Sequence, residues 1–180
     1  MDVSNYTGHL SEAQALGLQE EGIAFLIAGT QNESVTRQQL RIAIASEMDV
    51  DAYVMLYPGD TDSQVLRGIE VVYGLPIGRL WLDVEVAGLT LDHVRRASRI
   101  CETNNIPWGI YTSRSKWQEL TGDSDELSSA PLWAAFYDGV PNLDNWGGPY
   151  GGWKKPMVKQ YQGSTQLAGV LCDINVREGT

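Results

Sequence analysis

The sequence predicts an α/β domain in which eight strands close into a barrel. Three observations support this class. Short apolar runs alternate with amphipathic segments up to about residue 120, three strand-like runs follow with no convincing helix between them, and acidic residues recur in the strand runs. The length of 180 residues and a hydrophobic content of 43% suit one domain with a sizeable core.

The first part of the chain contains five apolar runs of strand type, each followed by a helix-type segment. The predicted strands are Met1–Ser4, Ile23–Ala28, Ala52–Tyr57, Leu80–Glu85 and Trp108–Thr112. Capping residues mark four helix starts, namely Ser11, Thr36, Asp60 or Thr61, and Thr90. Alternating strands and helices favour a mostly parallel sheet, either open or closed.

The pattern changes after Gly122. Three strand-like runs follow, Leu132–Tyr137, Met157–Gln162 and Val170–Ile174, and loops join them. The connection between the first two runs is rich in glycine, and we expect a mobile loop whose aromatic tips form a groove rim: Trp146, Tyr150 and Trp153. Five β/α units and three strands would close a barrel in which the first and last strands are neighbours.

The most informative segment is the apolar run Leu80–Val86, which carries Asp83 and Glu85 one residue apart. Side chains alternate along a strand, so the two acids share a face, with roughly 7 Å of backbone between them. A buried acid costs several kcal/mol unless it is paired, hydrogen-bonded or protonated. The pair therefore suggests glycoside hydrolysis. The alternative is a strand end whose acids are solvated or cap the next helix.

Two further acids belong to the same predicted site. Ligand chemistry in α/β barrels lies at the C-terminal ends of the strands. Asp2 falls near the end of the first strand and Asp173 falls in the last, and closure of the barrel would bring them side by side. We therefore expect four carboxylates around one pocket.

Composition and charge argue against several other functions. The net charge of −10 makes nucleic-acid binding a poor candidate. No apolar run approaches the ~18 residues of a membrane span. Neither His9 nor His93 has a metal-type neighbourhood, and Cys101 and Cys172 are expected to be separate buried thiols.

Six segments follow one another in the order and spacing of a known family: Asp2–Gly8, Leu82–Glu85, Gly109–Thr112, Leu132–Ala135, Gln160–Tyr161 and Cys172–Asn175. Together they resemble glycoside hydrolase family 25, the N-acetylmuramidases often called Chalaropsis-type lysozymes. The resemblance implies a flattened, TIM-like (β/α)5β3 barrel. It also implies cleavage, with retention, of the β-1,4 bond between N-acetylmuramic acid and N-acetylglucosamine in peptidoglycan.

The resemblance also assigns roles. Glu85 matches the general acid/base, and Asp83, Asp2 and Asp173 match the other acids of the catalytic pocket. The nucleophile is either a carboxylate or the acetamido oxygen of the substrate, and we favour the second, with Asp83 orienting the acetamido N–H. Neither a cofactor nor a metal is expected.

Aromatic rings supply the other half of a sugar site, because the C–H faces of a pyranose pack on flat rings. Five residues within or just after predicted strands are expected to bind substrate, with the barrel core as the alternative place for some: Tyr6, Tyr53, Tyr111, Trp133 and Tyr161. The expected partner is the glycan strand of bacterial peptidoglycan, with no nucleic acid and no membrane. We expect a monomer that works outside the cell or at the cell wall.

Three departures from the family pattern affect the edge of the pocket. Ala28–Thr30 lacks a lysine, Val54–Tyr57 lacks a histidine, and Thr7 replaces a glutamine. Two alternatives therefore stay open: a non-catalytic glycan-binding barrel, and a hydrolase of another N-acetylated glycan such as chitin. Because Asp2 directly follows Met1, we expect residues 1–180 to be a catalytic domain taken from a longer protein.

Overall fold

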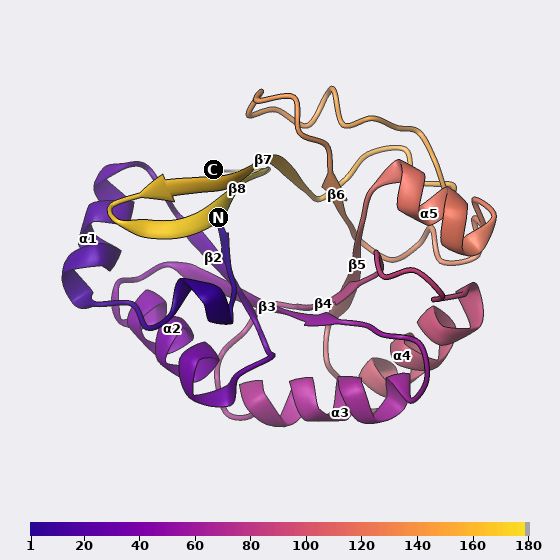
Figure 1. Ribbon diagram of the computed structural model, residues 1–180, viewed down its shortest axis with the longest axis horizontal. Coiled ribbons are helices and arrows are strands. Elements are labelled where there is room, and N and C mark those ends of the chain that lie inside the picture. Colours follow the sequence, from indigo (N-terminus) through magenta and orange to yellow (C-terminus); the bar gives the residue numbers. More distant parts are fainter. Residues whose placement is uncertain (179–180) are drawn as a thin grey trace.

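The computed structural model describes residues 1–178 and confirms the predicted closed barrel (Figure 1). The strands follow one another around the barrel in sequence order. They are β1 (Asp2–Val3), β2 (Phe25–Gly29), β3 (Asp49–Met55), β4 (Leu80–Asp83), β5 (Trp108–Thr112), β6 (Leu132–Ala135), β7 (Val158–Leu167) and β8 (Val170–Arg177). Strands β1 to β7 pair in parallel, whereas β8 is antiparallel to both of its neighbours.

Five α-helices and one short 3-10 helix connect the strands in the described part of the chain. They are η1 (Asn5–Thr7), α1 (Glu12–Glu20), α2 (Glu33–Ala45), α3 (Thr61–Val72), α4 (Leu91–Thr103) and α5 (Arg114–Thr121). The α-helices surround the left, lower and right sides of the barrel in Figure 1, and the long connection from β6 to β7 lies above α5. No helix within residues 1–178 has the length and apolar character needed to cross a membrane.

Several element boundaries differ from the sequence-based expectation. Strand β4 ends at Asp83, so Glu85 follows the strand instead of lying within it. Strand β7 extends five residues beyond the predicted run, to Leu167, because it pairs with the start of β8 as a hairpin that continues past the barrel wall. Strand β8 extends to Arg177, because its last residues pair with the start of β7. The outer residues of β7 alternate between half-buried and exposed, so hydrophobicity does not mark them as strand.

The predicted helix caps are confirmed at three positions and wrong at one. Thr90 is the N-cap residue of α4. The side chains of Ser11 and Asp60 accept the backbone N–H groups of Gln14 and Ser63. Asn32, not Thr36, caps α2. The Thr36 hydroxyl is buried and lies 2.6 Å from the Gly29 carbonyl oxygen, so it ties α2 to the end of β2.

The apolar residues form two clusters, one inside the barrel and one between the strands and their cover. The inner cluster consists of Phe25, Ile27, Tyr53, Trp81, Tyr111, Trp133 and Val158. Alternation along each strand sends these side chains inward and their neighbours toward the helices. Gly109 makes room for the largest of them, since a Cβ there would lie 2.5 Å from the Trp81 ring.

The aromatic residues of the β6–β7 connection are buried, so the prediction of aromatic tips at a groove rim is wrong. Trp146, Tyr150 and Trp153 are each at most 6% exposed and belong to the outer cluster. The Trp153 indole N–H donates to the Ala130 carbonyl oxygen at 2.8 Å, and its ring contacts Trp117 of α5 at 4.8 Å between centroids. With no helix between β6 and β7, this connection supplies the apolar cover that a helix would otherwise give.

Candidate active site

A cleft of about 690 Å³ opens at the C-terminal ends of the parallel strands. All four acids singled out from the sequence line it: Asp2, Asp83, Glu85 and Asp173. They come from opposite sides of the barrel, since β1 and β8 carry Asp2 and Asp173 whereas β4 and the residues after it carry the other two. Because β8 is antiparallel, Asp173 reaches this mouth from the first half of its strand.

Asp2 and Asp173 face each other across the seam that closes the barrel. They are direct partners in the β1–β8 pairing. The Gln160 amide N–H group donates to both carboxylates, at 2.8 Å to Asp2 Oδ2 and 3.2 Å to Asp173 Oδ2. Asn175 Nδ2 donates to Asp2 Oδ2 at 2.8 Å, and the Ser164 backbone N–H donates to Asp173 Oδ1 at 2.6 Å. Both acids are therefore held by neutral donors.

The orientation of the two amides is fixed by their other contacts. The hydroxyls of Tyr111 and Tyr137 donate to Gln160 Oε1 at 2.8 and 2.7 Å. The Trp133 indole N–H donates to Asn175 Oδ1 at 2.8 Å. Since each amide oxygen is occupied by donors, each NH₂ group must face the carboxylates.

Asp83 is the most buried of the four acids and has an oxygen without a hydrogen-bond partner in residues 1–178. It is 3% exposed, and its buried Oδ1 has no hydrogen-bond partner among the described residues. Burial raises the pKa of Asp83 well above its ordinary value, and the nearby carboxylates of Glu85 and Asp2 raise it further. A buried oxygen without a partner is unfavourable in the free protein and is available to a ligand donor.

Glu85 occupies a more open position on the same side of the cleft. Partial burial raises its pKa, an effect that Lys116 opposes and Asp173 reinforces. The pKa of Asp2 rises to about 6, chiefly through burial, although its hydrogen bonds from Asn175 and Gln160 act in the other direction. The cleft thus favours protonated carboxyl groups at mildly acidic pH.

Four of the five predicted substrate-binding aromatics line the cleft. Tyr53, Tyr111 and Trp133 form its inner wall and are at most 8% exposed, whereas Tyr6 stands at the mouth and is 86% exposed. The Trp133 ring lies 4.4 Å from that of Tyr111 and 6.2 Å from that of Tyr53, so the wall is a packed aromatic surface.

The prediction for Tyr161 is wrong. Its ring packs, partly buried, against the outer apolar cluster and does not line the cleft. Tyr161 directly follows Gln160 on β7, and neighbours on a strand point to opposite faces.

Sequence reasoning missed Gln160, Asn175, Tyr57 and Tyr137 as site residues. Gln160 is 2% exposed and Asn175 is 8% exposed. An amide within an apolar strand run was the available signal, because a buried amide needs hydrogen-bond partners. Tyr57 lines the cleft, and the hydroxyl of Tyr137 donates to Gln160 beside it.

No group of three or more His, Cys, Asp or Glu side chains in residues 1–178 is arranged to hold a metal ion. His9 is exposed, and His93 accepts the Thr90 backbone N–H at the start of α4. Cys101 and Cys172 are both free and buried, as predicted.

A closed α/β barrel whose mouth carries several carboxylates among aromatic rings has the layout of a glycoside hydrolase. A family model described as "Lysozyme-like protein 1" matches residues 5–161. The chain therefore belongs to the lysozyme-like proteins of glycoside hydrolase family 25.

Two relatives from Dictyostelium discoideum are similar to this chain over most of its length, and one of them is named as a lysozyme of the family. "Probable GH family 25 lysozyme 3" is 32% identical over 76% of this chain and 31% of its own length. "Counting factor 50" is 28% identical over 88% of this chain and 54% of its own length. The chain thus spans about a third to a half of the length of these two relatives.

Among solved structures, the muramidase from Trichobolus zukalii has a similar fold. The TM-score is 0.79 at 20% sequence identity, and the match covers 99% of this chain and 92% of that one. The barrel of the present chain is therefore the fold of that muramidase.

Proposed function

We propose that this domain is an N-acetylmuramidase that cleaves the β-1,4 bond between N-acetylmuramic acid and N-acetylglucosamine of peptidoglycan, with retention. The observation that carries the proposal is the pair Asp83 and Glu85 in one aromatic cleft, both with a raised pKa. The lysozyme relative and the muramidase neighbour support this choice of substrate.

Glu85 is the proposed general acid. Its raised pKa lets the carboxyl keep a proton at mildly acidic pH, and its partial exposure leaves it accessible to the glycosidic oxygen. It donates that proton as the bond to the anomeric carbon breaks. The resulting carboxylate then takes a proton from the incoming water in the second step.

Asp83 is the proposed positioning acid for substrate assistance. Its unpartnered Oδ1 is available to accept the acetamido N–H of the sugar. The acetamido carbonyl oxygen would then attack the anomeric carbon from the face opposite the leaving group, forming a cyclic intermediate. Water opens this ring from the other face, and two inversions give net retention.

Asp2 and Asp173 are proposed to stabilise the positive charge that develops at the anomeric carbon. Their contacts with Gln160 and Asn175 hold them in place before substrate arrives. Preorganised groups of this kind are effective because they need little rearrangement during the reaction. We further propose that the domain acts as a monomer, outside the cell or at the cell wall.

A glycan-binding barrel without activity is the second candidate. The observation in its favour is that one relative, 28% identical, is named a counting factor and not a lysozyme. This candidate predicts polysaccharide binding that Glu85→Gln does not weaken.

The two candidate functions can be distinguished by measuring new reducing ends released from purified peptidoglycan and from chitin, between pH 3 and 8. We expect muramic-acid reducing ends from peptidoglycan that vanish in the Glu85→Gln variant. Cleavage of chitin alone would mean that the substrate is another N-acetylated glycan. Binding without cleavage in the folded protein would favour the second candidate.

A further inference from the structure

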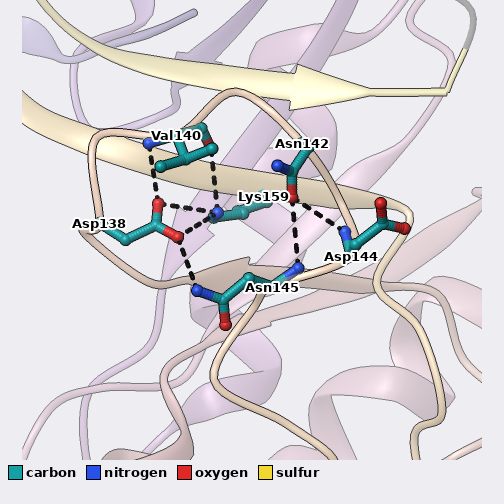
Figure 2. Close-up of polar contacts among 6 residues, drawn as sticks. All are labelled: Asp138, Val140, Asn142, Asp144, Asn145 and Lys159. Carbon is teal, nitrogen blue, oxygen red and sulfur yellow. Dashed lines mark hydrogen bonds and ion pairs between the residues drawn. The ribbon is translucent and has the colours of Figure 1, made fainter.

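Lys159 is a fully buried cation outside the proposed catalytic machinery. It lies on β7, its side chain is 0% exposed, and its ammonium group contacts the Asp138 carboxylate at 2.8 Å (Figure 2). It also donates to the Val140 carbonyl oxygen at 3.0 Å and lies 5.5 Å from the centre of the Phe136 ring. A charge buried this completely is retained only when such partners compensate it.

The Asp138 carboxylate likewise has several hydrogen-bond donors. Besides Lys159, it accepts the Val140 backbone N–H at 2.9 Å and Asn145 Nδ2 at 3.1 Å. Asn142 holds this turn by accepting the backbone N–H groups of Asp144 and Asn145, as Figure 2 shows. Lys159 thus joins Asp138 and Val140 of the loop 136–145 to β7. The backbone N–H groups of Phe136 and Gly139 also donate to β7, at the Gln160 and Tyr161 carbonyl oxygens.

The same loop and strand also meet at the cleft, through side chains. Tyr137 precedes Asp138, and Gln160 follows Lys159. The Tyr137 hydroxyl donates to Gln160 Oε1 at 2.7 Å. Successive residues of a strand point to opposite faces. The ion pair therefore contacts the loop on the outer side of β7, and the hydrogen bond from Tyr137 to Gln160 contacts it on the inner side.

Tyr137 lies beside the acids on this side of the cleft. A Cβ placed at Gly163 would be 3.5 Å from Tyr137 Cζ and 3.6 Å from Asp173 Oδ1, so the ring and the carboxylate flank the same glycine. Tyr137 is 61% exposed, although its hydroxyl contacts the buried Gln160. An exposed aromatic face beside a carboxylate suits one sugar ring.

We propose that Lys159 and Asp138 are positioning residues, whose ion pair holds Tyr137 over Gln160 as a platform for one sugar ring of the glycan. This inference rests on the proposed function, because the platform matters only if a glycan occupies the cleft. It predicts that losing the ion pair weakens substrate binding through Tyr137 and through no other residue.

The test is a double-mutant cycle on soluble peptidoglycan fragments. Lys159→Met removes the charge and keeps an apolar stem, and we expect kcat/KM to fall about tenfold, mainly through KM. Tyr137→Ala should lose a similar factor. In the double variant the two losses should not multiply, because Lys159 acts through Tyr137. Multiplied losses, or unchanged kcat/KM in a folded Lys159→Met, would overturn the proposal.

Two further variants serve as controls for a general loss of stability. Asp138→Asn keeps an oxygen for the Val140 N–H and should lose about threefold in kcat/KM, so it replaces Lys159→Met if that variant does not fold. Arg95→Met removes the partly exposed ion pair to Glu126, neither residue of which lines the cleft, and should leave kcat/KM unchanged. If Arg95→Met lost as much kcat/KM as Lys159→Met, the loss would reflect reduced stability and not the position of Tyr137.

A readout independent of activity separates this inference from the proposed function. The side-chain amide resonances of Gln160 in the ¹⁵N spectrum should move in Lys159→Met as they do in Tyr137→Phe, and stay in place in Arg95→Met. If the parent protein cleaves no glycan, the proposed function fails while this shift still establishes the positioning contact. Gln160 resonances that move in Tyr137→Phe but not in Lys159→Met would overturn it.

Discussion

On one side of the cleft Asp2 accepts hydrogen bonds from Gln160 and Asn175, whereas on the other side Asp83 keeps a buried oxygen without a partner. Both carboxyls are nearly inaccessible and both have a raised pKa. The two sides differ in the source of the hydrogen-bond donors to the carboxyl group. The β1–β8 side is complete before substrate arrives, while the β4 side leaves hydrogen-bonding capacity for the substrate.

This comparison predicts that the largest loss of activity comes from the β4 side. Glu85→Gln should lower kcat by about a thousandfold, because the amide cannot supply the proton. In the parent, the rate should fall as pH rises through the raised pKa of Glu85. Steady-state kinetics of parent and variant between pH 3 and 8 check both points. A variant that keeps its rate would remove Glu85 from the role of acid.

Asp83→Asn should have the next largest effect on activity. We expect kcat to fall about a hundredfold with KM nearly unchanged, since the group acts on the acetamido N–H in the reacting complex. Stability should change little or improve, because the substitution removes a buried acid that lacks a partner. The control is a substrate without the N-acetyl group. Equal losses on both substrates would argue against substrate assistance.

The β1–β8 side should respond in stability as well as in activity, and Asp2→Asn tests this. The pKa of Asp2 is about 6 in the folded protein and 3.8 in the reference state. A raised pKa means that the folded state binds the proton more tightly than the unfolded state does. The contribution of Asp2 to the free energy of unfolding is therefore full below pH 4 and is lost as pH rises through 6. The neutral variant avoids that loss, on the order of 3 kcal/mol.

The measurement is urea unfolding of parent and variant at several pH values. The difference in free energy of unfolding should grow in favour of Asp2→Asn between pH 4 and 6 and stay constant above. A difference that does not change with pH would show that Asp2 is already ionised in the folded protein at pH 4.

Asn175→Ala should give the smallest effect of the four. It removes one donor to Asp2 and leaves the Trp133 indole N–H without its acceptor. We expect a loss of about 2 kcal/mol in stability and a further rise in the pKa of Asp2, since this hydrogen bond lowers it. Thermal unfolding and a carboxyl ¹³C titration measure the two effects. A pKa of Asp2 that falls would contradict the assigned hydrogen bond.

Much of the architecture was predictable from local patterns. Alternating apolar runs and capping residues indicated the β/α units, and strand alternation placed Asp83 and Glu85 at one site. Barrel closure then predicted that Asp2 and Asp173 would be neighbours, which the β1–β8 pairing confirms. The catalytic roles of the four acids stay predictions.

Other features depended on contacts between distant parts of the chain. The hydrogen bonds from Gln160 and Asn175 to Asp2 join residues 158 and 173 positions apart. The burial of Trp153 likewise depends on α5 and on the Ala130 carbonyl group.

The sequence by itself determined the class of fold, the order of its elements and the acids at the mouth of the barrel, because periodicity and capping act over a few residues. Only the tertiary structure decided which amides hold those acids, which rings face the cleft, and how Lys159 secures the loop that carries Tyr137. Burial and hydrogen-bond geometry are properties of the packed chain, since each depends on partners that closure of the barrel brings together.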